Sequence, residues 1–436
     1  MGGLSNVQFE TLRTLVQSAP DAALRSLDLA MESDTSGGAA MGEIRRLIAL
    51  ESADRNVRDR VLAPLLPLCR AAPRPLQRLV FLPALPGRLW RALNAELPSL
   101  AETARGAETT EDEPFPRPDD VLCREAGKRV RERSGAFAAV VDPAEAACLA
   151  ACLELAPIAR RALPRLSDWI GRHTEERTAA ARVAYKDAVA VVEDGGPRLL
   201  EMLMGHLEEP WVILRVVSAV MDHPGDDFVA ASELASFGER VLDDIDARLA
   251  LVTGLDLSRG REAGAEAGRA VHVATMEIAA FEEAIEMTRN GPWAVRLMGQ
   301  KRQLASAVEK RLKFVEEAIA AALPLQAGRR KGPRGHPRLS HDPDLAALVR
   351  AETLVAFTPE VRSAAAVAGF GAVRAQAAEA SEDRLSQYVE DLLEVIHLQA
   401  PEAGRARLYL DAAAELLGLL SGVKAAQLVR RRAAAA

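Results

Sequence analysis

Residues 234–252 read LASFGERVLDDIDARLALV, and an apolar residue returns every three or four positions along them. An α-helix has 3.6 residues per turn, so this spacing places the apolar side chains on one helix face. The members of this stripe are Leu234, Phe237, Val241, Ile245, Leu249 and Val252. The segment is therefore predicted to be an amphipathic helix whose apolar face packs against other protein elements.

Two more stripes of the same kind follow. The first consists of Ala267, Val271, Ala274, Ile278, Phe281 and Ile285. The second consists of Leu304, Val308, Leu312, Val315, Ile319 and Leu323. The connections at 253–264 and 290–292 are short enough for antiparallel neighbours, and the small residues of the middle stripe permit close helix approach. We therefore predict three helices in an up-down-up bundle.

The rest of the chain also reads as helical. Proline stands at the first-turn position of several predicted helices, as in Asp142-Pro143 and Asp342-Pro343, where the aspartate is expected to cap the helix. Sustained β-type alternation is absent, so the predicted fold class is all-α, a multi-helix bundle with long antiparallel amphipathic helices. An α-solenoid is the alternative, because the starts at Pro210-Trp211 and Pro292-Trp293 resemble each other.

Composition divides the chain into five ranges. Residues 1–100 are predicted to form an N-terminal helical region, followed by an acidic, proline-containing linker at 101–120. A central helical bundle is expected at 121–326. A basic joint rich in glycine and proline follows at 327–344, and a C-terminal helical region completes the chain at 345–436.

Overall composition narrows the class of protein. The 436 residues are 49% hydrophobic and 27% charged, as in globular proteins, and the net charge of −7 argues against a surface devoted to nucleic acid. Four cysteines in so long a chain do not make a disulfide framework.

The sequence also bears on localisation. With no signal-peptide pattern and no apolar run of membrane-spanning length, we predict a cytoplasmic protein without a transmembrane segment. The abundance of arginine and alanine suggests a bacterial genome of high GC content.

Three small groups of residues are candidates for metal chemistry. The turn containing Asp222, His223, Asp226 and Asp227 combines an imidazole with carboxylates that could bind a hard cation or transfer protons. Such residues also accumulate in turns for backbone reasons. Asp243 and Asp246 are three apart on one helix, as a magnesium-diphosphate site requires, but Ala247 occupies the next position on that face, which favours a solvated surface.

Cys148 and Cys152 are spaced four apart and would share a helix face, where two thiolates could form half of a zinc site. No neighbouring pair of cysteine or histidine residues completes it. The alternative interpretation is that both are small buried apolar residues.

Basic residues are concentrated at two places. They are Arg329, Arg330, Lys331, Arg334 and Arg338 in the joint, and Arg430, Arg431 and Arg432 near the C-terminus. Either group could contact phosphates or an anionic membrane surface. Neither is interleaved with aromatic residues that could stack on bases, so a solvated segment is the competing interpretation.

Motifs for nucleophilic catalysis or nucleotide binding are missing from the sequence, so no cofactor is predicted and an enzyme is disfavoured. The leading hypothesis is a helical protein that acts through protein–protein contacts as a scaffold, adaptor or regulatory subunit. It requires a protein partner, and the heptad-like stripes also suit a homodimer. The alternatives are nucleic-acid or anionic-surface binding through residues 328–338 and the C-terminal arginines, and an all-α enzyme with an acidic metal site.

Overall fold

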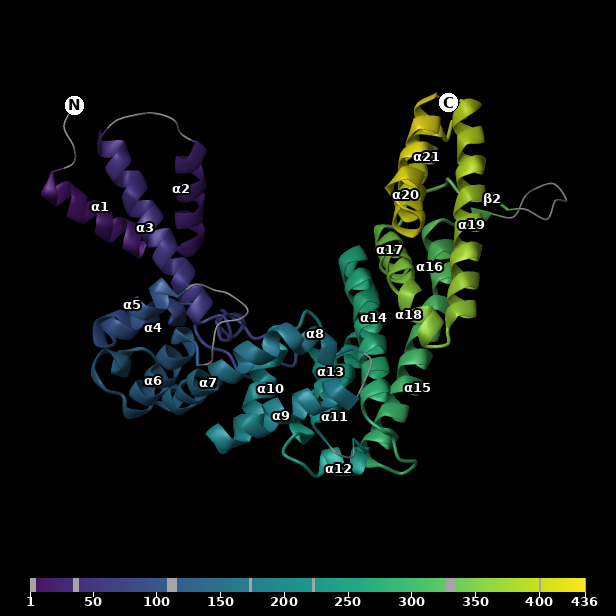
Figure 1. Cartoon of the computed structure of the whole chain (residues 1–436). Helices are drawn as coiled ribbons and strands as arrows, with labels where there is room; N and C mark the ends of the chain where they lie inside the picture. Colours follow the sequence, from purple (N-terminus) through teal and green to yellow (C-terminus); the bar gives the residue numbers. More distant parts are fainter. Residues whose placement is uncertain are drawn as a thin grey trace. The chain divides into compact units, whose positions relative to one another are not determined.

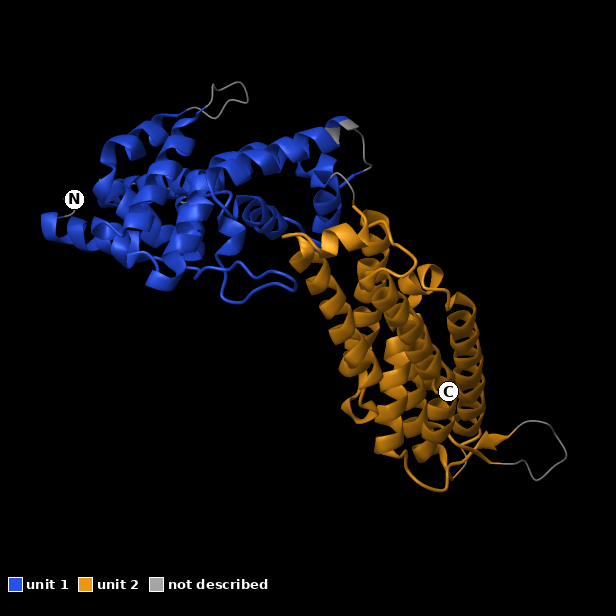
Figure 2. Cartoon of the chain, turned by 90° about the horizontal axis from the view of Figure 1, so that it is seen from below, with its two compact units in different colours: residues 1–222 blue, residues 223–436 orange. Residues whose placement is uncertain are grey.

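Helices make up nearly all the regular structure of the computed structural model, which describes residues 5–33, 39–107, 116–171, 175–221, 224–326, 335–399 and 401–435 (Figure 1). Within these ranges the named strands are β1 (Leu325–Gln326) and β2 (His336–Pro337), which pair antiparallel. The all-α fold class is confirmed, while the choice between bundle and solenoid stays a prediction. The chain divides into two compact units, unit 1 at residues 1–222 and unit 2 at residues 223–436 (Figure 2).

Unit 1 is built from α-helices joined by short 3-10 turns. Its elements are α1 (Asn6–Ser18), α2 (Asp21–Ser33), α3 (Ala39–Val61), η1 (Leu66–Leu68), α4 (Leu85–Glu96), α5 (Pro98–Gly106), α6 (Pro118–Glu132), η2 (Gly135–Ala139), α7 (Pro143–Ala162), η3 (Leu163–Arg165), α8 (Leu166–Trp169), α9 (Glu175–Val191), α10 (Gly195–Gly205), η4 (Pro210–Val212) and α11 (Ile213–Val220).

Unit 2 is built from longer helices. Its helical elements are α12 (Asp226–Ala230), α13 (Ala235–Thr253), η5 (Leu257–Arg259), α14 (Arg261–Ala284), α15 (Pro292–Lys313), α16 (Val315–Ala322), α17 (Leu345–Glu360), α18 (Arg362–Val367), α19 (Gly371–His397), α20 (Ala403–Ser421) and α21 (Val423–Ala435). Among the helices in the described ranges, none has both the length and the apolar character needed to cross a bilayer.

The unit boundary falls within 121–326, the range predicted as one central bundle. Helical structure also reaches into both ends of the predicted linker at 101–120, because α5 continues to Gly106 and α6 begins at Pro118. Residues 108–115 of the linker and residues 327–334 of the basic joint lie outside the described residues. In the rest of the joint, the β1–β2 pairing joins Gln326 to His336.

The three apolar stripes are buried as predicted, with every member at most 5% exposed. They lie on α13, on α14, and on α15 together with α16, and α13 contacts both α14 and α15. The prediction of one continuous third helix is wrong, because the helix is interrupted at Phe314, between α15 and α16. Val315 and Ile319 of α16 join the core formed by α17, α19 and α20 instead.

The middle helix, α14, makes its closest approach to α17. A Cβ atom at Gly264 would overlap the carbonyl oxygen of Thr353, and one at Gly268 would lie 3.0 Å from the carbonyl oxygen of Phe357. These two glycines bring the backbones of α14 and α17 close together. They are not members of the middle stripe, so the close approach predicted for the small residues of that stripe stays a prediction. The predicted helix start at Asp342-Pro343 is wrong by two residues: α17 begins at Leu345, and Asp344, not Asp342, is its cap.

In unit 1, a partly buried arginine of α7 connects the end of α3 to α6 and α7. Arg160 on α7 donates from Nη1 to the carbonyl oxygen of Arg60 (2.7 Å) and from Nη2 to that of Val61 (2.6 Å). Its Nε donates to Asp120 Oδ1 (3.1 Å), and Asp120 is fully buried. Carbonyl groups at the end of α3 that lack helical partners are satisfied in this way.

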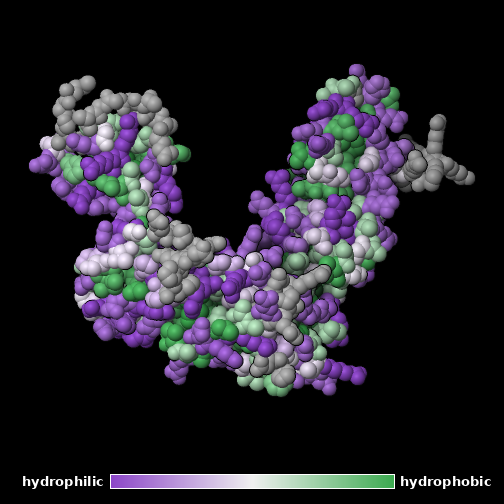
Figure 3. Space-filling model, in the orientation of Figure 1, coloured by the Kyte–Doolittle hydropathy of each residue, from purple (hydrophilic) through white to green (hydrophobic). Residues whose placement is uncertain are grey.

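The first three helices share a small core of their own, whose buried members are Val16, Leu24 and Ile48. Arg55 on α3 joins α1 and α2, since its guanidinium donates to the carbonyl oxygen of Val16 and to the carboxylate of Asp21. Several large apolar side chains remain exposed here, namely Val7, Leu15, Leu29 and Leu50. On the face drawn in Figure 3, hydrophobic residues are interspersed among hydrophilic ones.

Candidate functional site

Asp226, a candidate metal ligand, is fully buried and caps a helix. Its Oδ1 accepts hydrogen bonds from the backbone N–H (3.1 Å) and the hydroxyl (2.8 Å) of Thr288, and its Oδ2 accepts one from the N–H of Ala294 (3.4 Å) in the first turn of α15. Asp227 is exposed, and its Oδ2 lies 3.4 Å from the Thr288 hydroxyl. Asp222 and His223 lie outside the described residues.

The donors around Asp226 are those of a structural cap. Within the described ranges, no group of three or more histidine, cysteine, aspartate or glutamate side chains is arranged to hold a metal ion. The buried carboxylate of Asp226 thus serves backbone N–H groups that would otherwise be unsatisfied at the start of α15.

Replacing Asp226 by alanine is expected to destabilise unit 2 by about 2 kcal/mol, because the N–H group of Ala294 loses its acceptor in a buried site and that of Thr288 loses its acceptor in a partly buried one. Urea unfolding of the full chain measures this loss. The matched control is Asp227→Ala, one residue along and exposed, for which a change below about 0.5 kcal/mol is expected. Equal losses in the two variants would contradict the capping role.

The carboxylates of Asp243 and Asp246 are paired with an arginine of the neighbouring helix. Arg296 on α15 donates from Nη2 to Asp243 Oδ1 (2.6 Å) and to Asp246 Oδ2 (2.6 Å), and from Nη1 to Glu239 Oε2 (3.0 Å). Gln300 adds a hydrogen bond from Nε2 to Asp246 Oδ1 (2.7 Å). The acidic face of α13 therefore joins α13 to α15.

The C-terminal arginines are partly paired within unit 2. Arg432 makes two hydrogen bonds to the carboxylate of Glu390 on α19 (2.5 and 2.7 Å), and Arg430 lies 3.7 Å from Glu415 on α20. Arg431 is exposed. Two of the three positive charges are thus partly neutralised by carboxylates of the same unit.

In the basic joint, Arg338 lies in the described part of the chain. Its Nε donates to Ser340 Oγ (3.4 Å), and its backbone N–H donates to the carbonyl oxygen of Pro324 (2.9 Å). The other four candidates of the joint, Arg329, Arg330, Lys331 and Arg334, lie outside the described residues.

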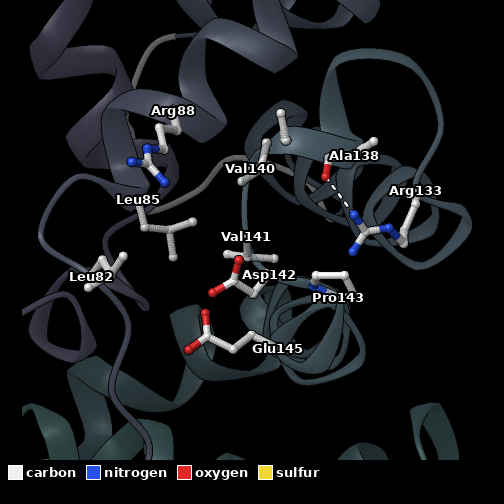
Figure 4. A pocket seen from close by; sticks show the side chains of 11 residues that line it. Leu82, Leu85, Arg88, Arg133, Ala138, Val140, Val141, Asp142, Pro143 and Glu145 are labelled. Carbon is white, nitrogen blue, oxygen red and sulfur yellow. Dashed lines mark hydrogen bonds between the residues drawn. The ribbon is translucent and has the colours of Figure 1, made fainter.

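A cavity of about 180 Å³ in unit 1 gathers charged side chains from three segments (Figure 4). Leu82, Leu85 and Arg88 come from α4 and the residues before it. The other walls are Arg133, which follows α6, residues 138–141, and the start of α7 with Asp142, Pro143 and Glu145.

The charges of this cavity are largely unpaired. In Figure 4 the carboxylates of Asp142 and Glu145 lie near each other on one side of the cavity. Within the described ranges, the side chains of Arg88, Asp142 and Glu145 make no hydrogen bond or ion pair. Asp142 occupies the N-cap position of α7 without making a side-chain capping bond, so the capping role expected for it is wrong.

Arg133 is held in place by the backbone. Its φ of 51° is left-handed, and its Nη2 donates to the carbonyl oxygen of Ala138 (2.8 Å). The second terminal nitrogen, Nη1, is buried and has no hydrogen-bond partner. A buried N–H group without an acceptor costs about 1–3 kcal/mol, so Arg133 is an incompletely satisfied donor in the wall of the cavity.

Sequence reasoning missed this cavity. It singled out Asp142 only as a helix cap, and it passed over Arg88, Arg133 and Glu145. These residues come from separate segments, and no spacing rule links them before the chain is folded.

Comparison with known proteins finds no relative of this chain. No protein-family model matches it, no curated protein matches it, and no solved structure matches it.

Proposed function

We propose that this protein acts through protein–protein contacts and that the cavity lined by Arg88, Arg133, Asp142 and Glu145 receives a charged segment of the partner. The observation that carries the proposal is the set of unpaired charges of both signs around one concave site. Complementary charges on a partner would supply the missing contacts and fix its orientation.

The size of the cavity favours a side chain over a metabolite. Sites for drug-sized small molecules usually measure about 300–1,000 Å³ and are mostly apolar. This cavity measures about 180 Å³, and four of its lining residues are charged. A long basic or acidic side chain of a partner, rather than a free cofactor, suits such a volume.

The test removes charge without changing shape. We expect the double variant Asp142→Asn, Glu145→Gln to retain the partner at least about tenfold less than the wild type, in a pull-down from the native host quantified by mass spectrometry. The matched control is Glu132→Gln, an exposed residue at the end of α6. Circular dichroism checks that both variants are folded.

Two outcomes would contradict different parts of the proposal. Equal partner retention by the wild type and the double variant would exclude the cavity as the contact site. Light scattering that finds a monomer, together with a pull-down that retains no partner, would remove the protein-contact function itself.

A further inference from the structure

Helix α7 brings two cysteines to one face, and a helix packed against it supplies a guanidinium. Cys148 and Cys152 are one turn apart on α7, and Arg198 of α10 donates from Nη1 to Cys148 Sγ at 2.8 Å. Cys152 is fully buried, whereas Cys148 is only partly buried. Cys148 is therefore the more accessible residue of the two.

The charged groups facing Cys148 come from both helices. Arg198 is itself held by an ion pair with Asp194, at the start of α10, and Glu145 lies one turn before Cys148 on α7. A hydrogen bond from the Cys152 thiol lowers the pKa of Cys148, burial opposes it, and the charge of Arg198 lowers it further. The carboxylates of Asp194 and Glu145 act in the opposite direction.

We infer that Cys148 is a thiol-modification site whose sulfur, in contact with the guanidinium of Arg198, reacts with small-molecule disulfides of the glutathione type. The Cys148 sulfur attacks one sulfur of the small disulfide. A new S–S bond forms, the old one breaks, and the released thiolate carries away the electron pair and takes a proton from water. Cys148 is thereby oxidised to a mixed disulfide, and half of the small disulfide is reduced to a thiol.

The helix prevents Cys152 from resolving that mixed disulfide. Side chains one turn apart on an α-helix have Cβ atoms about 5–6 Å apart, whereas a disulfide needs about 3.5–4.5 Å. An internal bond between Cys148 and Cys152 would therefore distort α7 in the middle of its buried face. The modification therefore remains on Cys148. This inference does not depend on the proposed function.

The other two cysteines are internal controls in the same chain. Burial raises the pKa of Cys69 to about 12 and that of Cys123 to about 12. Cys69 is partly buried, as Cys148 is, so exposure alone does not separate the two. Cys123 is fully buried and reports loss of the fold if it becomes reactive.

The experiment treats the reduced full-length chain with oxidised glutathione at pH 7 and follows each cysteine by peptide mass spectrometry. We expect Cys148 to be modified at least about tenfold faster than Cys69, since exchange depends on the thiolate fraction. In Arg198→Gln the rate at Cys148 should fall at least about fivefold, while the exposed control Arg165→Gln leaves it unchanged.

Two results would overturn the inference. One is modification of Cys148 in the wild type at a rate no greater than that of Cys69. The other is an unchanged Cys148 rate in Arg198→Gln while Cys123 stays unreactive. If Cys123 becomes reactive in Arg198→Gln, that variant has lost its fold and Arg198→Lys is tested in its place. A lysine keeps the positive charge and should retain most of the Cys148 rate.

Discussion

Replacing Gly264 by alanine is expected to destabilise unit 2 by about 3 kcal/mol, the upper part of the range for overpacked interiors. The added Cβ would overlap the carbonyl oxygen of Thr353, which belongs to the backbone of α17. A flexible side chain could move aside, but here two buried helices would have to separate. Apolar contacts along both α14 and α17 would weaken as a result.

Gly299 on α15 provides the matched control. It also lies inside a helix of unit 2, but a Cβ there would meet nothing within 4 Å. Gly299→Ala should stabilise the unit by about 0.5–1 kcal/mol, because alanine loses less backbone entropy than glycine on folding. Hydrogen exchange of α14 and α17 peptides in increasing urea measures both effects. Effects of the same sign in the two variants would contradict the close approach of α14 and α17.

Helix periodicity was sufficient to predict the apolar faces of unit 2, since the same side chains that recur every three or four residues are buried. Periodicity did not predict the interruption of the helix at Phe314. The stripe keeps its spacing from Leu312 to Val315 across the break, so one helix and two successive helices give the same pattern. Packing of α16 on α17 and α19 accompanies the break, and those contacts come from later parts of the chain.

The candidate sites were less predictable because their contacts are remote in sequence. Asp226 meets Thr288 62 residues later. Cys148 meets Arg198 50 residues later. Local composition suggested a metal turn for the first and half of a zinc site for the second. Neither the helix cap nor the arginine–thiol contact leaves a signal in residue spacing.

The largest pH-dependent effect is expected from Glu277, a fully buried residue of α14. Burial, followed by the neighbouring Asp244 carboxylate, raises its pKa to about 9 from the ordinary value of 4.5, against the opposing charge of Arg248. Arg248 lies 3.3 Å from Glu277 Oε2 but forms its closer contact with Asp244, at 2.6 Å. Both carboxyl oxygens of Glu277 lack a hydrogen-bond donor.

The sign of the effect follows from proton binding. Below pH 4.5 Glu277 is protonated in both the folded and unfolded chains, so it imposes no charge penalty on folding. Between pH 4.5 and 9 the unfolded chain loses the proton while the folded chain keeps it, and stability falls by about 1.4 kcal/mol per pH unit. Near pH 9 the folded protein also ionises, and the loss levels off.

Glu277→Gln removes this ionisation while keeping the size of the side chain. The variant should match the wild type near pH 4.5 and exceed it by about 3 kcal/mol at pH 7, as the free energy of unfolding in urea at a series of pH values will measure. Glu266→Gln, on the exposed face of the same helix, should give no such pH-dependent difference. If Glu277 were instead ionised in the folded protein and stabilised by Arg248, its replacement would lower stability at pH 7, because the arginine would lose a buried partner.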